Sequence, residues 1–446
     1  MRRRAAAHAV ALLAASAVYL GVIAWLVEIW VDNGNLTMHT TADLLARTAG
    51  LAGLIAAYLA NVQVVLLSRL PFLERLAGFD RLTQWHRWNG HLCIVLVLVH
   101  VVLQIQGYSM PTHRSFGDEF WTMVARGAFP GMITATIGTF LLLVVGWSSF
   151  AIARRRMSYE LWYAVHLTAY AGIALSWFHE IPTGGDINDQ LNPGNAWFWR
   201  SLFIATLAAL AWRVLAPFLS LTRHRMRVVD VVPEGPDVTS VRIAGRRLSG
   251  LRAEPGQFFL WRFLTRGHWW AAHPFSLSAA PDGDTFRITT KAVGGHTSRM
   301  RTIPVGTRVV AEGPFGDFTD RSRRREKVLL VAGGIGITPV RALLERMPGD
   351  VVAIYRVLAD RDIVFADELA ELERERGVTV HYVVGDHAGP NGHELLSPEH
   401  LSRLVPDLPE REVYLCGPPA MTAVTEKRLR AAGVPRRRLH VERFAL

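Results

Sequence analysis

The sequence predicts a bundle of six membrane-spanning helices, followed by a small antiparallel β-barrel and then an α/β domain with a parallel sheet. Long apolar runs fill the first half of the 446 residues, and short alternating runs separated by Gly and Pro follow them. Apolar strands that alternate with helical stretches end the chain. Half of the residues are hydrophobic and 20% are charged, as expected when a lipid-buried part is joined to a water-exposed part. The predicted domains are 1–221, 222–322 and 323–446.

Six segments approach the roughly 20 apolar residues that a membrane helix needs. The first begins like a signal peptide, with Arg2 to Arg4 before an apolar run, but that run continues to about Val31. We therefore expect it to be retained as a helix. After Leu221 no comparable run occurs. The six predicted spans are 8–31, 43–66, 86–105, 131–152, 160–178 and 197–219.

The distribution of Lys and Arg predicts the orientation, because cationic side chains in short loops are retained on the cytoplasmic side. With six spans, all the basic segments fall on one side of the membrane, and the remaining loops are polar or acidic. The C-terminal half is therefore expected in the cytoplasm. The basic segments are 2–4, 69–87, 154–156 and 223–227.

Charge and cysteine content exclude other classes of protein. The net charge is +11, but the Arg residues gather at the ends of apolar runs rather than along one polar helix, which argues against nucleic-acid binding. Only two cysteines occur, Cys93 and Cys416, so the chain can form neither a disulfide framework nor a Cys-based zinc site. Membrane lipid is the expected surrounding of the first half.

Histidines inside the predicted spans are the strongest functional signal, since an ionisable group in a bilayer is by default a functional candidate. His86 and His100 are 14 positions apart, so they share a helix face to within roughly 40° and lie about 21 Å apart along the axis. His166 and His179 are 13 positions apart, and an ideal helix would rotate them roughly 140° from each other. The second pair therefore requires a bend, a π-bulge or a tilted ring.

The third and fifth spans run in the same direction, which places His86 level with His166 and His100 level with His179. Two imidazoles at each level match a haem iron with two histidine ligands, whereas zinc would require three or four ligands close together. We therefore predict two b-type haems on these four side chains. His91 faces away from His86 and is expected to form a hydrogen bond or contact a haem propionate, with a structural role as the alternative.

The segments WHRW…LVH and YELWYAVHLTAYAGIALSWFHE resemble the ferric reductase and NADPH oxidase superfamily of transmembrane flavocytochromes, in the compact form found in bacteria. In that family the paired histidines have the same unequal spacings of 14 and 13 positions. Its haem ligands map onto His86, His100, His166 and His179. The resemblance covers nearly the whole chain. It implies a multi-pass protein of a bacterial plasma membrane with cytoplasmic FAD and nicotinamide domains.

Two segments in the predicted barrel resemble the flavin site of ferredoxin-reductase-like proteins. In the first, the backbone lies along the flavin, and the hydroxyl of Ser276 approaches the ring nitrogen that exchanges hydride. The second precedes a predicted helix, where backbone N–H groups and the positive helix end favour a pyrophosphate; a hairpin turn with an N-cap is the alternative. The segments are His273, Pro274, Phe275 and Ser276, and Gly294, Gly295, His296 and Thr297.

The strand KVLLVAG runs into a Gly-rich turn and a helix, the arrangement in which backbone approaches a dinucleotide pyrophosphate. The spacing differs from GxGxxG and resembles the GGxGxTP turn of the ferredoxin-reductase nucleotide domain. Arg356 ends the next strand without an acidic residue beside it, which favours the 2′-phosphate of NADPH over NADH. The turn residues are Gly333, Gly334, Gly336, Thr338 and Pro339.

Two further positions carry roles that the resemblance implies. Cys416, Gly417 and Pro418 follow the strand REVYL, and the family places this Cys beside the nicotinamide; a buried core thiol is the alternative. Phe444 matches the C-terminal aromatic that stacks over the flavin, with a core aromatic as the alternative.

The combined expectation is that electrons pass from cytoplasmic NADPH through FAD and two haems to an extracytoplasmic acceptor, either oxygen, which gives superoxide, or ferric iron. Oxygen-reducing relatives carry an Arg that Arg47 matches, but a His where this chain has Gln104. One alternative is an electron-donating subunit that requires a periplasmic partner protein. Another is a flavin reductase with a merely structural membrane anchor. No calcium-binding loop or Pro-rich partner motif is visible in the sequence, so activity is expected to be constitutive and a protein partner is not indicated.

Overall fold

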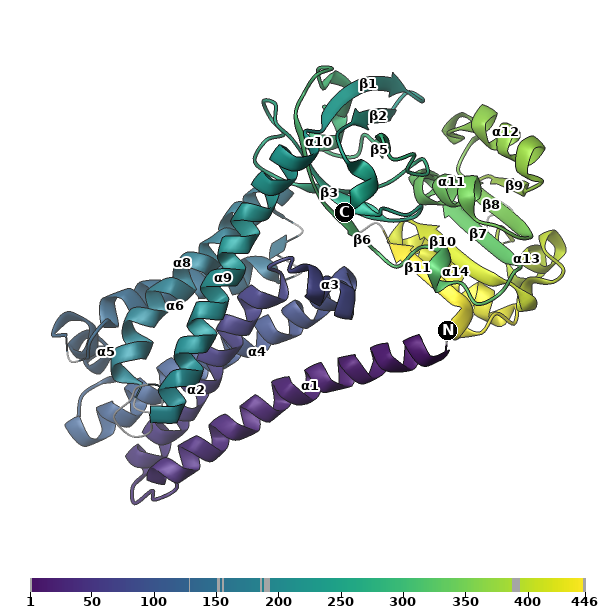
Figure 1. Ribbon diagram of the computed structural model, residues 1–446. Helices are drawn as coiled ribbons and strands as arrows, with labels where there is room; N and C mark the ends of the chain where they lie inside the picture. The colour runs from purple at the N-terminus through teal and green to yellow at the C-terminus, as the bar shows by residue number, and fades with distance from the viewer. Residues whose placement is uncertain are drawn as a thin grey trace. The chain divides into compact units, whose positions relative to one another are not determined.

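The computed structural model describes residues 2–127, 129–150, 153–154, 156–184, 187, 193–386 and 394–443. The chain divides into two compact units, Met1–Val214 and Leu215–Leu446. Among the described residues, helices make up the first unit, and every strand lies in the second (Figure 1).

Six long helices correspond to the six predicted spans. The first ends in a π-helical turn, Val31–Asn35. Two short helices that the sequence did not predict, α3 (Pro71–Ala77) and α5 (Phe116–Ala125), lie between them in the chain. The long helices are α1 (Arg2–Trp30), α2 (Thr41–Leu66), α4 (Phe79–Thr112), α6 (Met132–Ser149), α8 (Tyr159–Thr183) and α9 (Pro193–His224).

Side-chain caps define where two of these helices begin. The Thr40 hydroxyl accepts the Asp43 N–H, and the Asp43 carboxylate accepts the Thr40 N–H, which forms a capping box at the start of α2. Ser158 accepts the Leu161 N–H at the start of α8. Each cap satisfies a backbone N–H that the helix leaves without a partner.

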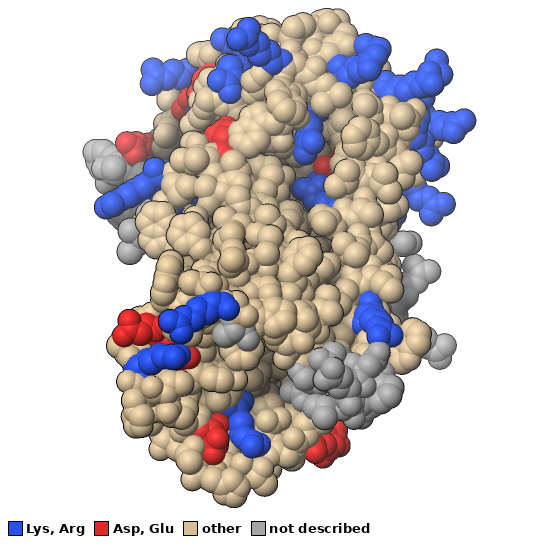
Figure 2. Space-filling view, turned by 90° about the vertical axis from the view of Figure 1, so that its left-hand side faces the viewer, with Lys and Arg blue, Asp and Glu red and all other residues tan. Residues whose placement is uncertain are grey.

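Five helices are long and apolar enough to cross a membrane within the described parts of the chain. Helix α8 is 25 residues long but is not among them, because its His, Glu, Ser and Thr residues lower its mean hydropathy. The sixth span therefore stays a prediction. Figure 2 shows a broad region without charged side chains, with Lys, Arg, Asp and Glu gathered above and below it. The five segments are Val10–Asn35, Thr41–Leu66, Arg81–Thr112, Met132–Ser149 and Asn195–His224.

Glycines allow close approach within two helix pairs. Helix α2 packs along α4, and α6 packs along α8. A Cβ on Gly138 of α6 would lie 2.7 Å from the carbonyl oxygen of Gly172 in α8, and one on Gly107 of α4 would lie 2.9 Å from the Ala46 nitrogen in α2. A larger residue at Gly107 would push α4 away from α2, and one at Gly138 would push α6 away from α8. Helices α4 and α8 carry the four histidines.

The second unit begins with two antiparallel three-stranded sheets. Isolated bridges, Arg227 to Arg308 and Leu277 to Ile288, connect the sheets at their edges. The prediction of antiparallel strands is confirmed. The two isolated bridges are the contacts by which these sheets approach a barrel. One sheet has the order β1 (Arg227–Pro233), β2 (Val238–Ala244), β5 (Thr285–Lys291), and the other β4 (His273–Ser276), β3 (Phe258–Phe263), β6 (Val309–Phe315).

The rest of the second unit is an α/β domain whose five strands are all parallel, as predicted, with the order β11-β10-β7-β8-β9. Side chains alternate along β7, so Leu330 packs with α11 and α12 while Leu329 packs with α13 and α14. The elements are β7 (Val328–Gly333), α11 (Ile337–Arg346), β8 (Val351–Val357), α12 (Ala366–Arg376), β9 (Thr379–Val384), α13 (Pro398–Leu404), β10 (Glu412–Gly417), α14 (Pro419–Ala431) and β11 (Leu439–Arg443).

The strand order places a switch point between β7 and β10. The chain leaves β7 toward β8 on one side and leaves β10 toward β11 on the other. In open parallel sheets, ligands bind beyond the carboxyl ends of the strands at such a point. The residues that follow these two strands are therefore the first place to examine for a ligand site.

Candidate functional site: paired histidines and two nucleotide-binding turns

The first pair of membrane histidines meets in space. The ring centroids of His86 on α4 and His166 on α8 lie 5.9 Å apart. His100 and His179 are also close enough for their charges to interact. The structure thus places His86 beside His166, and His100 within electrostatic range of His179.

The Nδ1 atoms of these rings are held by hydrogen bonds. Nδ1 of His86 lies 3.2 Å from the Gln63 carbonyl oxygen, and Nδ1 of His100 lies 2.8 Å from that of Ala49. Nδ1 of His179 lies 3.0 Å from the carbonyl oxygen of Pro130. A carbonyl oxygen only accepts hydrogen bonds, so Nδ1 carries the proton in these three rings. The lone pair of Nε2 is then available for a metal.

His166 differs from the other three, because its Nδ1 lies 3.4 Å from the Ser149 hydroxyl, which either donates or accepts. Its ring also packs against Trp162, with centroids 4.9 Å apart. The hydrogen bond therefore leaves the tautomer of this ring open, while the packing restrains its plane.

Glycine makes room for the His100 ring. A Cβ on Gly53 of α2 would lie only 2.6 Å from Nδ1 of His100. A Cβ on Gly131 would lie 2.8 Å from the backbone nitrogen of His179, the other histidine of this pair. Both glycines therefore permit a backbone approach that another residue would block.

A polar chain behind His86 was missed by the sequence reasoning. The Gln63 amide donates to the His86 carbonyl over 2.8 Å, and Asn89 donates to the Gln63 side-chain oxygen over 2.6 Å. The Tyr19 hydroxyl donates to Asn89 over 3.0 Å. The available signal was the presence of two carboxamide side chains inside apolar runs, since buried polar groups need partners.

Arg47 lies on α2 near the loop that follows α1. Its guanidinium donates to the carbonyl oxygen of Gly34 over 2.5 Å and to the Thr37 hydroxyl over 3.5 Å. Arg47 is two positions before Ala49, whose carbonyl accepts the bond from His100. The side chain therefore lies on the part of α2 that supports the second histidine pair.

The two flavin-motif segments meet in the second unit. The rings of His273 on β4 and His296 on the one-turn helix α10 (Gly295–Ser298) stack with centroids 3.5 Å apart. Phe275 lies in the same stack, 6.3 Å from His296. Burial, and secondarily the neighbouring His and Arg side chains, lower the pKa of His296 to about 3, so the stacked imidazole is neutral. His268, which the sequence reasoning also missed, lies 3.2 Å from His296 between the two Nδ1 atoms.

Other predicted flavin residues lie at the ends of these elements. Ser276 ends β4 and is buried, while Pro274 before it is exposed. Gly294 and Gly295 are exposed, and the Thr297 hydroxyl accepts the Gly294 N–H over 3.1 Å. The helix that was expected after this segment is only one turn long, so its dipole is small.

The Gly-rich turn and the segment Cys416 to Pro418 pack face to face, although they are far apart in the sequence. A Cβ on Gly336 would lie 2.4 Å from the Cys416 carbonyl oxygen, and one on Gly333 would lie 2.0 Å from the sulfur of Met421. Gly334 has a positive φ of 52°, which disfavours other residues. Thr338 donates to the Ile335 carbonyl over 3.0 Å, and buried Pro339 follows it in α11.

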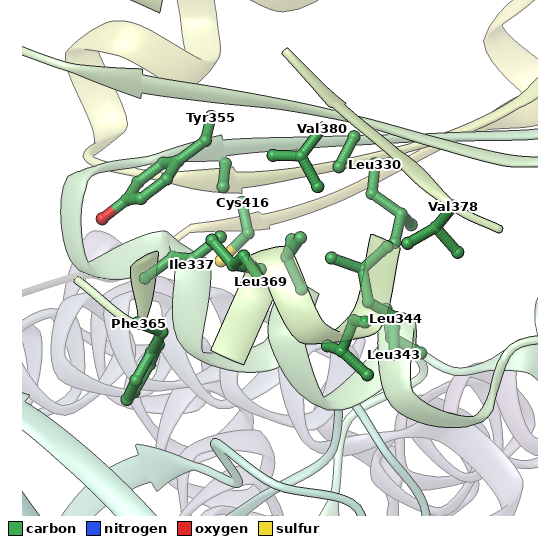
Figure 3. Packing of buried hydrophobic residues seen from close by; sticks show 14 of the residues in the cluster. Leu330, Ile337, Leu343, Leu344, Tyr355, Phe365, Leu369, Val378, Val380 and Cys416 are labelled. Atoms are coloured by element: carbon green, nitrogen blue, oxygen red, sulfur yellow. The ribbon is translucent and has the colours of Figure 1, made fainter. Parts of the chain in front are cut away.

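The Cys416 thiol lies in the core of the α/β domain. Its side chain is fully buried and points from β10 toward Ile337 at the start of α11 (Figure 3). Burial raises the pKa of this thiol. The structure therefore matches the core-thiol alternative more closely than a thiol facing a bound nicotinamide. The segment meets the turn through the Cys416 carbonyl oxygen and the Gly417 backbone instead.

Arg356 is buried at the end of β8, where it pairs with Gly333 in the sheet register. Its guanidinium donates to the carbonyls of Val357 and Val383, and burial lowers its pKa. In this position the side chain binds the sheet rather than projecting toward a 2′-phosphate. Phe444 lies outside the described residues.

No cluster of three or more His, Cys, Asp or Glu side chains that could hold a metal ion occurs in the described part of the chain.

Comparison with known proteins is consistent with these sites. Residues 52–177 match the family model described as a ferric reductase like transmembrane component. Residues 223–319 match a FAD-binding domain, and residues 330–427 match an oxidoreductase NAD-binding domain. These three matches, in this order along the chain, are those of the ferric reductase and NADPH oxidase-like superfamily. The chain is accordingly a membrane flavoprotein and an NAD(P)H-dependent oxidoreductase with FAD- and nicotinamide-binding domains.

Curated relatives and a solved structure share about half of the chain. The glycine betaine monooxygenase reductase subunit of Chromohalobacter salexigens is 28% identical over 237 residues, 50% of this chain and 64% of that protein. The ferredoxin reductase component of 3-ketosteroid-9-alpha-monooxygenase from Mycolicibacterium smegmatis is 30% identical over 241 residues, 52% and 64% respectively. The chain thus spans less than two thirds of either relative. The flavohem-like FAD/NAD-binding domain of nitric oxide dioxygenase from Vibrio cholerae has a TM-score of 0.42 at 26% identity, over 49% of this chain and 98% of that one.

Proposed function

We propose that this ferric reductase-like protein transfers electrons from cytoplasmic NAD(P)H, by way of FAD and two b-type haems, to an acceptor on the opposite side of the membrane. The observation that carries the proposal is the pairing of His86 with His166 and of His100 with His179. Three of these rings carry the proton on Nδ1, which leaves Nε2 for iron. The domains proposed for this activity are 1–221, 222–322 and 323–446.

The residues present fit two haems. Neutral imidazoles in pairs are the ligand set of a b-type haem, which shuttles one electron without an open coordination position. Gly53 leaves space for the His100 ring, and Gly131 leaves space for the backbone of Phe178 and His179. We assign one haem to His86 and His166 and the other to His100 and His179.

The residues present also fit FAD. Bound FAD would convert a two-electron hydride donor into one-electron steps. The stack of His273, Phe275 and His296 provides flat ring surfaces beside Ser276, and Ser276 holds a hydroxyl at the end of β4. The exposed backbone at Gly294 and Gly295 accommodates a phosphate without a clash from side chains.

The nicotinamide nucleotide is assigned to the switch point. Gly333, Gly336 and Gly417 let the turn after β7 pack directly against the segment after β10, and Gly334 has no atom within 4 Å of a Cβ position. Backbone of such a Gly-rich turn at the carboxyl end of a strand can approach a pyrophosphate. Arg356 was expected to select NADPH, and its buried guanidinium weakens that argument. NADPH is retained as the proposed donor, with NADH as the alternative, and the ratio of the two KM values tests the choice.

The proposed location is the plasma membrane of a bacterium, with six spans and with both nucleotide-binding domains in the cytoplasm. The basic loops support this orientation. The proposed sixth span is α8, because it carries His166 and His179 and packs along the apolar helix α6. Cysteine-accessibility labelling of residues introduced into each loop would test the topology.

The proposed acceptor is oxygen or a ferric complex at the outer haem. Arg47 lies on the part of α2 that supports His100 and supplies a positive charge there, which would attract an anionic acceptor or product. Since the guanidinium also holds the loop after α1, replacement of Arg47 with Gln should raise the KM for the acceptor more than it lowers the rate of haem reduction.

A second candidate function has a specific observation in its favour. Two of the relatives are named as reductase components of monooxygenases, which suggests donation of electrons to a partner protein instead of to a small molecule. In that case NADPH oxidation with oxygen or ferric chelate would stay slow until the partner was added.

The deciding experiment is a spectrum of the purified protein reduced by NADPH under nitrogen, minus the spectrum of the oxidised form. The expected result is the split absorbance signal of low-spin b-type haem, which disappears when oxygen or a ferric chelate is added. Absence of that signal would overturn the haem assignment. A signal that forms but persists with both acceptors would favour the partner-protein alternative.

A further inference from the structure

Four alternately charged side chains connect the flavin-binding sheets to helices α11 and α12; we refer to them as the charge clamp. Arg287 on β5 forms two parallel bonds to Glu368 on α12, with distances of 2.7 Å from Nη1 to Oε1 and 2.9 Å from Nη2 to Oε2. Nε of Arg341 on α11 lies 2.6 Å from Oε2 of Glu368. Nη1 of Arg341 lies 2.5 Å from Oε2 of Glu345.

The charge clamp also holds the segment that follows Ser276. Arg287 donates from Nη2 to the Ser278 carbonyl oxygen over 2.7 Å. The Ala280 N–H donates to Glu345 over 2.7 Å. The clamp is therefore bonded to the chain within a few residues of the hydroxyl assigned to the flavin.

At its other end, the clamp is bonded to the helix that follows the nucleotide turn. Helix α11 begins at Ile337, directly after Gly336, and carries Arg341 and Glu345 one and two turns later. The four side chains thus link the residues on either side of the proposed hydride-transfer site.

The position of Arg287 is closely defined. Its side chain is 8% exposed, and its guanidinium lies 4.7 Å from the ring centroid of Phe365. Nε donates to the Ser278 hydroxyl over 3.2 Å. A guanidinium bound through two parallel bonds has little rotational freedom, and a lysine cannot reproduce this geometry.

Net stability is a poor explanation for such a cluster. Desolvation of buried charges offsets most of their attraction, so an apolar cluster of similar volume would stabilise the fold about as well. Apolar contact between the two parts already exists, since Phe318 and Tyr414 pack edge to face with centroids 5.2 Å apart. Directional bonds define how β5 is rotated and aligned relative to α11 and α12, which apolar packing does not.

We propose that Arg287, Arg341, Glu345 and Glu368 are positioning residues that determine the distance between the nicotinamide and the flavin. This inference rests on the proposed assignment of both cofactors. In the step concerned, the hydride leaves the nicotinamide ring with its bonding electrons and joins the flavin, so the nicotinamide is oxidised and the flavin is reduced. A displacement of about 1 Å at such a site can lower the rate on the order of a hundredfold.

The test uses the full chain with bound FAD in detergent. The variants are Arg287→Lys, Glu368→Gln and the double variant. Arg242→Lys is a matched control, because Arg242 is the exposed cross-strand neighbour of Arg287 on β2. Glu371→Gln is the control on α12, where Glu371 is exposed. Stopped-flow absorbance under nitrogen gives the limiting rate of flavin reduction, the Kd for NADPH and the deuterium isotope effect on hydride transfer.

The expected result is a limiting rate at least tenfold lower in Arg287→Lys and Glu368→Gln, with Kd changed less than about threefold. The isotope effect should rise toward its full value, and reduction by dithionite should proceed as in the wild type. The double variant should be no slower than the slower single variant, since both remove the same contact.

Three results would overturn the positioning role. One is a limiting rate equal to that of the controls, and another is a slower rate that follows loss of FAD or of thermal stability in every clamp variant. The third is an unchanged isotope effect with a slower rate. If neither NADPH nor NADH reduces the wild-type flavin, the proposed function itself fails and the positioning role fails with it. If the wild-type flavin is reduced and the clamp variants reduce it at the same rate, only the positioning role is contradicted.

Discussion

Nδ1 of His100 on α4 lies 2.8 Å from the carbonyl oxygen of Ala49 on α2. Because the carbonyl accepts, the ring proton is fixed on Nδ1, and Nε2 carries the lone pair that can bind a metal. His91, on the same helix, instead stacks on Phe150 with centroids 6.0 Å apart.

This difference predicts opposite results for two substitutions. His100→Leu should lower the haem content from two to about one per flavin, because one ligand of the outer pair is lost. His91→Leu should retain both haems. Haem and flavin are measured by pyridine haemochrome and by released FAD, and flavin reduction by NADPH should be unchanged in both variants. Equal haem content in the two would contradict the ligand assignment.

The glycine beside His100 predicts a steric effect. In Gly53→Ala, the new methyl would lie 2.6 Å from Nδ1 of His100, which forces the ring away from Ala49. We expect loss of the outer haem or a changed reduction potential, measured by redox titration. Gly50→Ala on the same helix is the control, since no atom lies within 4 Å of its added methyl. A wild-type titration curve for Gly53→Ala would show that the ring is free to move.

The contact between Gly336 of the Gly-rich turn and the segment that follows β10 predicts that a larger residue at Gly336 weakens NADPH binding. The methyl of Gly336→Ala would lie 2.4 Å from the Cys416 carbonyl oxygen, so β10 and the turn must separate, at a cost of about 1–3 kcal/mol. Thermal unfolding should occur at lower temperature, and the Kd for NADPH should rise. Gly235→Ala, where the methyl meets no atom within 4 Å, should stay within about 0.5 kcal/mol of wild type.

Burial predicts that Cys416 is chemically inert in the folded protein. The thiol is fully buried and its pKa is raised, so little thiolate forms near neutral pH. Iodoacetamide at pH 8, followed by mass spectrometry, should leave Cys416 unmodified until denaturant is added. Rapid labelling that NADPH blocks would instead place the thiol at the nicotinamide site.

The charge clamp predicts a contribution to stability that depends on pH. Burial alone would raise the pKa of Glu368, but its bonds and ion pairs with Arg287 and Arg341 lower the pKa below the ordinary value of 4.5. The carboxylate therefore stabilises the folded state above pH 4.5, and this contribution is lost as pH falls through the folded pKa. Glu368→Gln should narrow the gap in melting temperature between pH 7 and pH 4. An unchanged gap would mean that other carboxylates dominate acid unfolding.

Much of the fold follows from local patterns. Apolar runs predicted the positions of all six long helices, and alternating strands and helices predicted the parallel sheet from Val328 onward. These features were accessible because helix and strand periodicities are repeated over many residues. The short helices α3 and α5 were missed, since at 7 and 10 residues they are too short for a repeated apolar pattern. Helix α3 begins at Pro71 without a side-chain cap, and only α5 is capped, by Ser115.

For the sites, too, some features were accessible from the sequence and others required the tertiary structure. The spacing of His86 and His100, and the resemblance for His166, His179, the flavin segments and the Gly-rich turn, selected the candidate residues from the sequence. It could not show which ring nitrogen carries the proton, that the Cys416 thiol and Arg356 face inward, or that Arg287 meets Glu368. Those features depend on contacts between distant segments, and only the packed fold defines which backbone carbonyl, methyl or carboxylate lies opposite a given side chain.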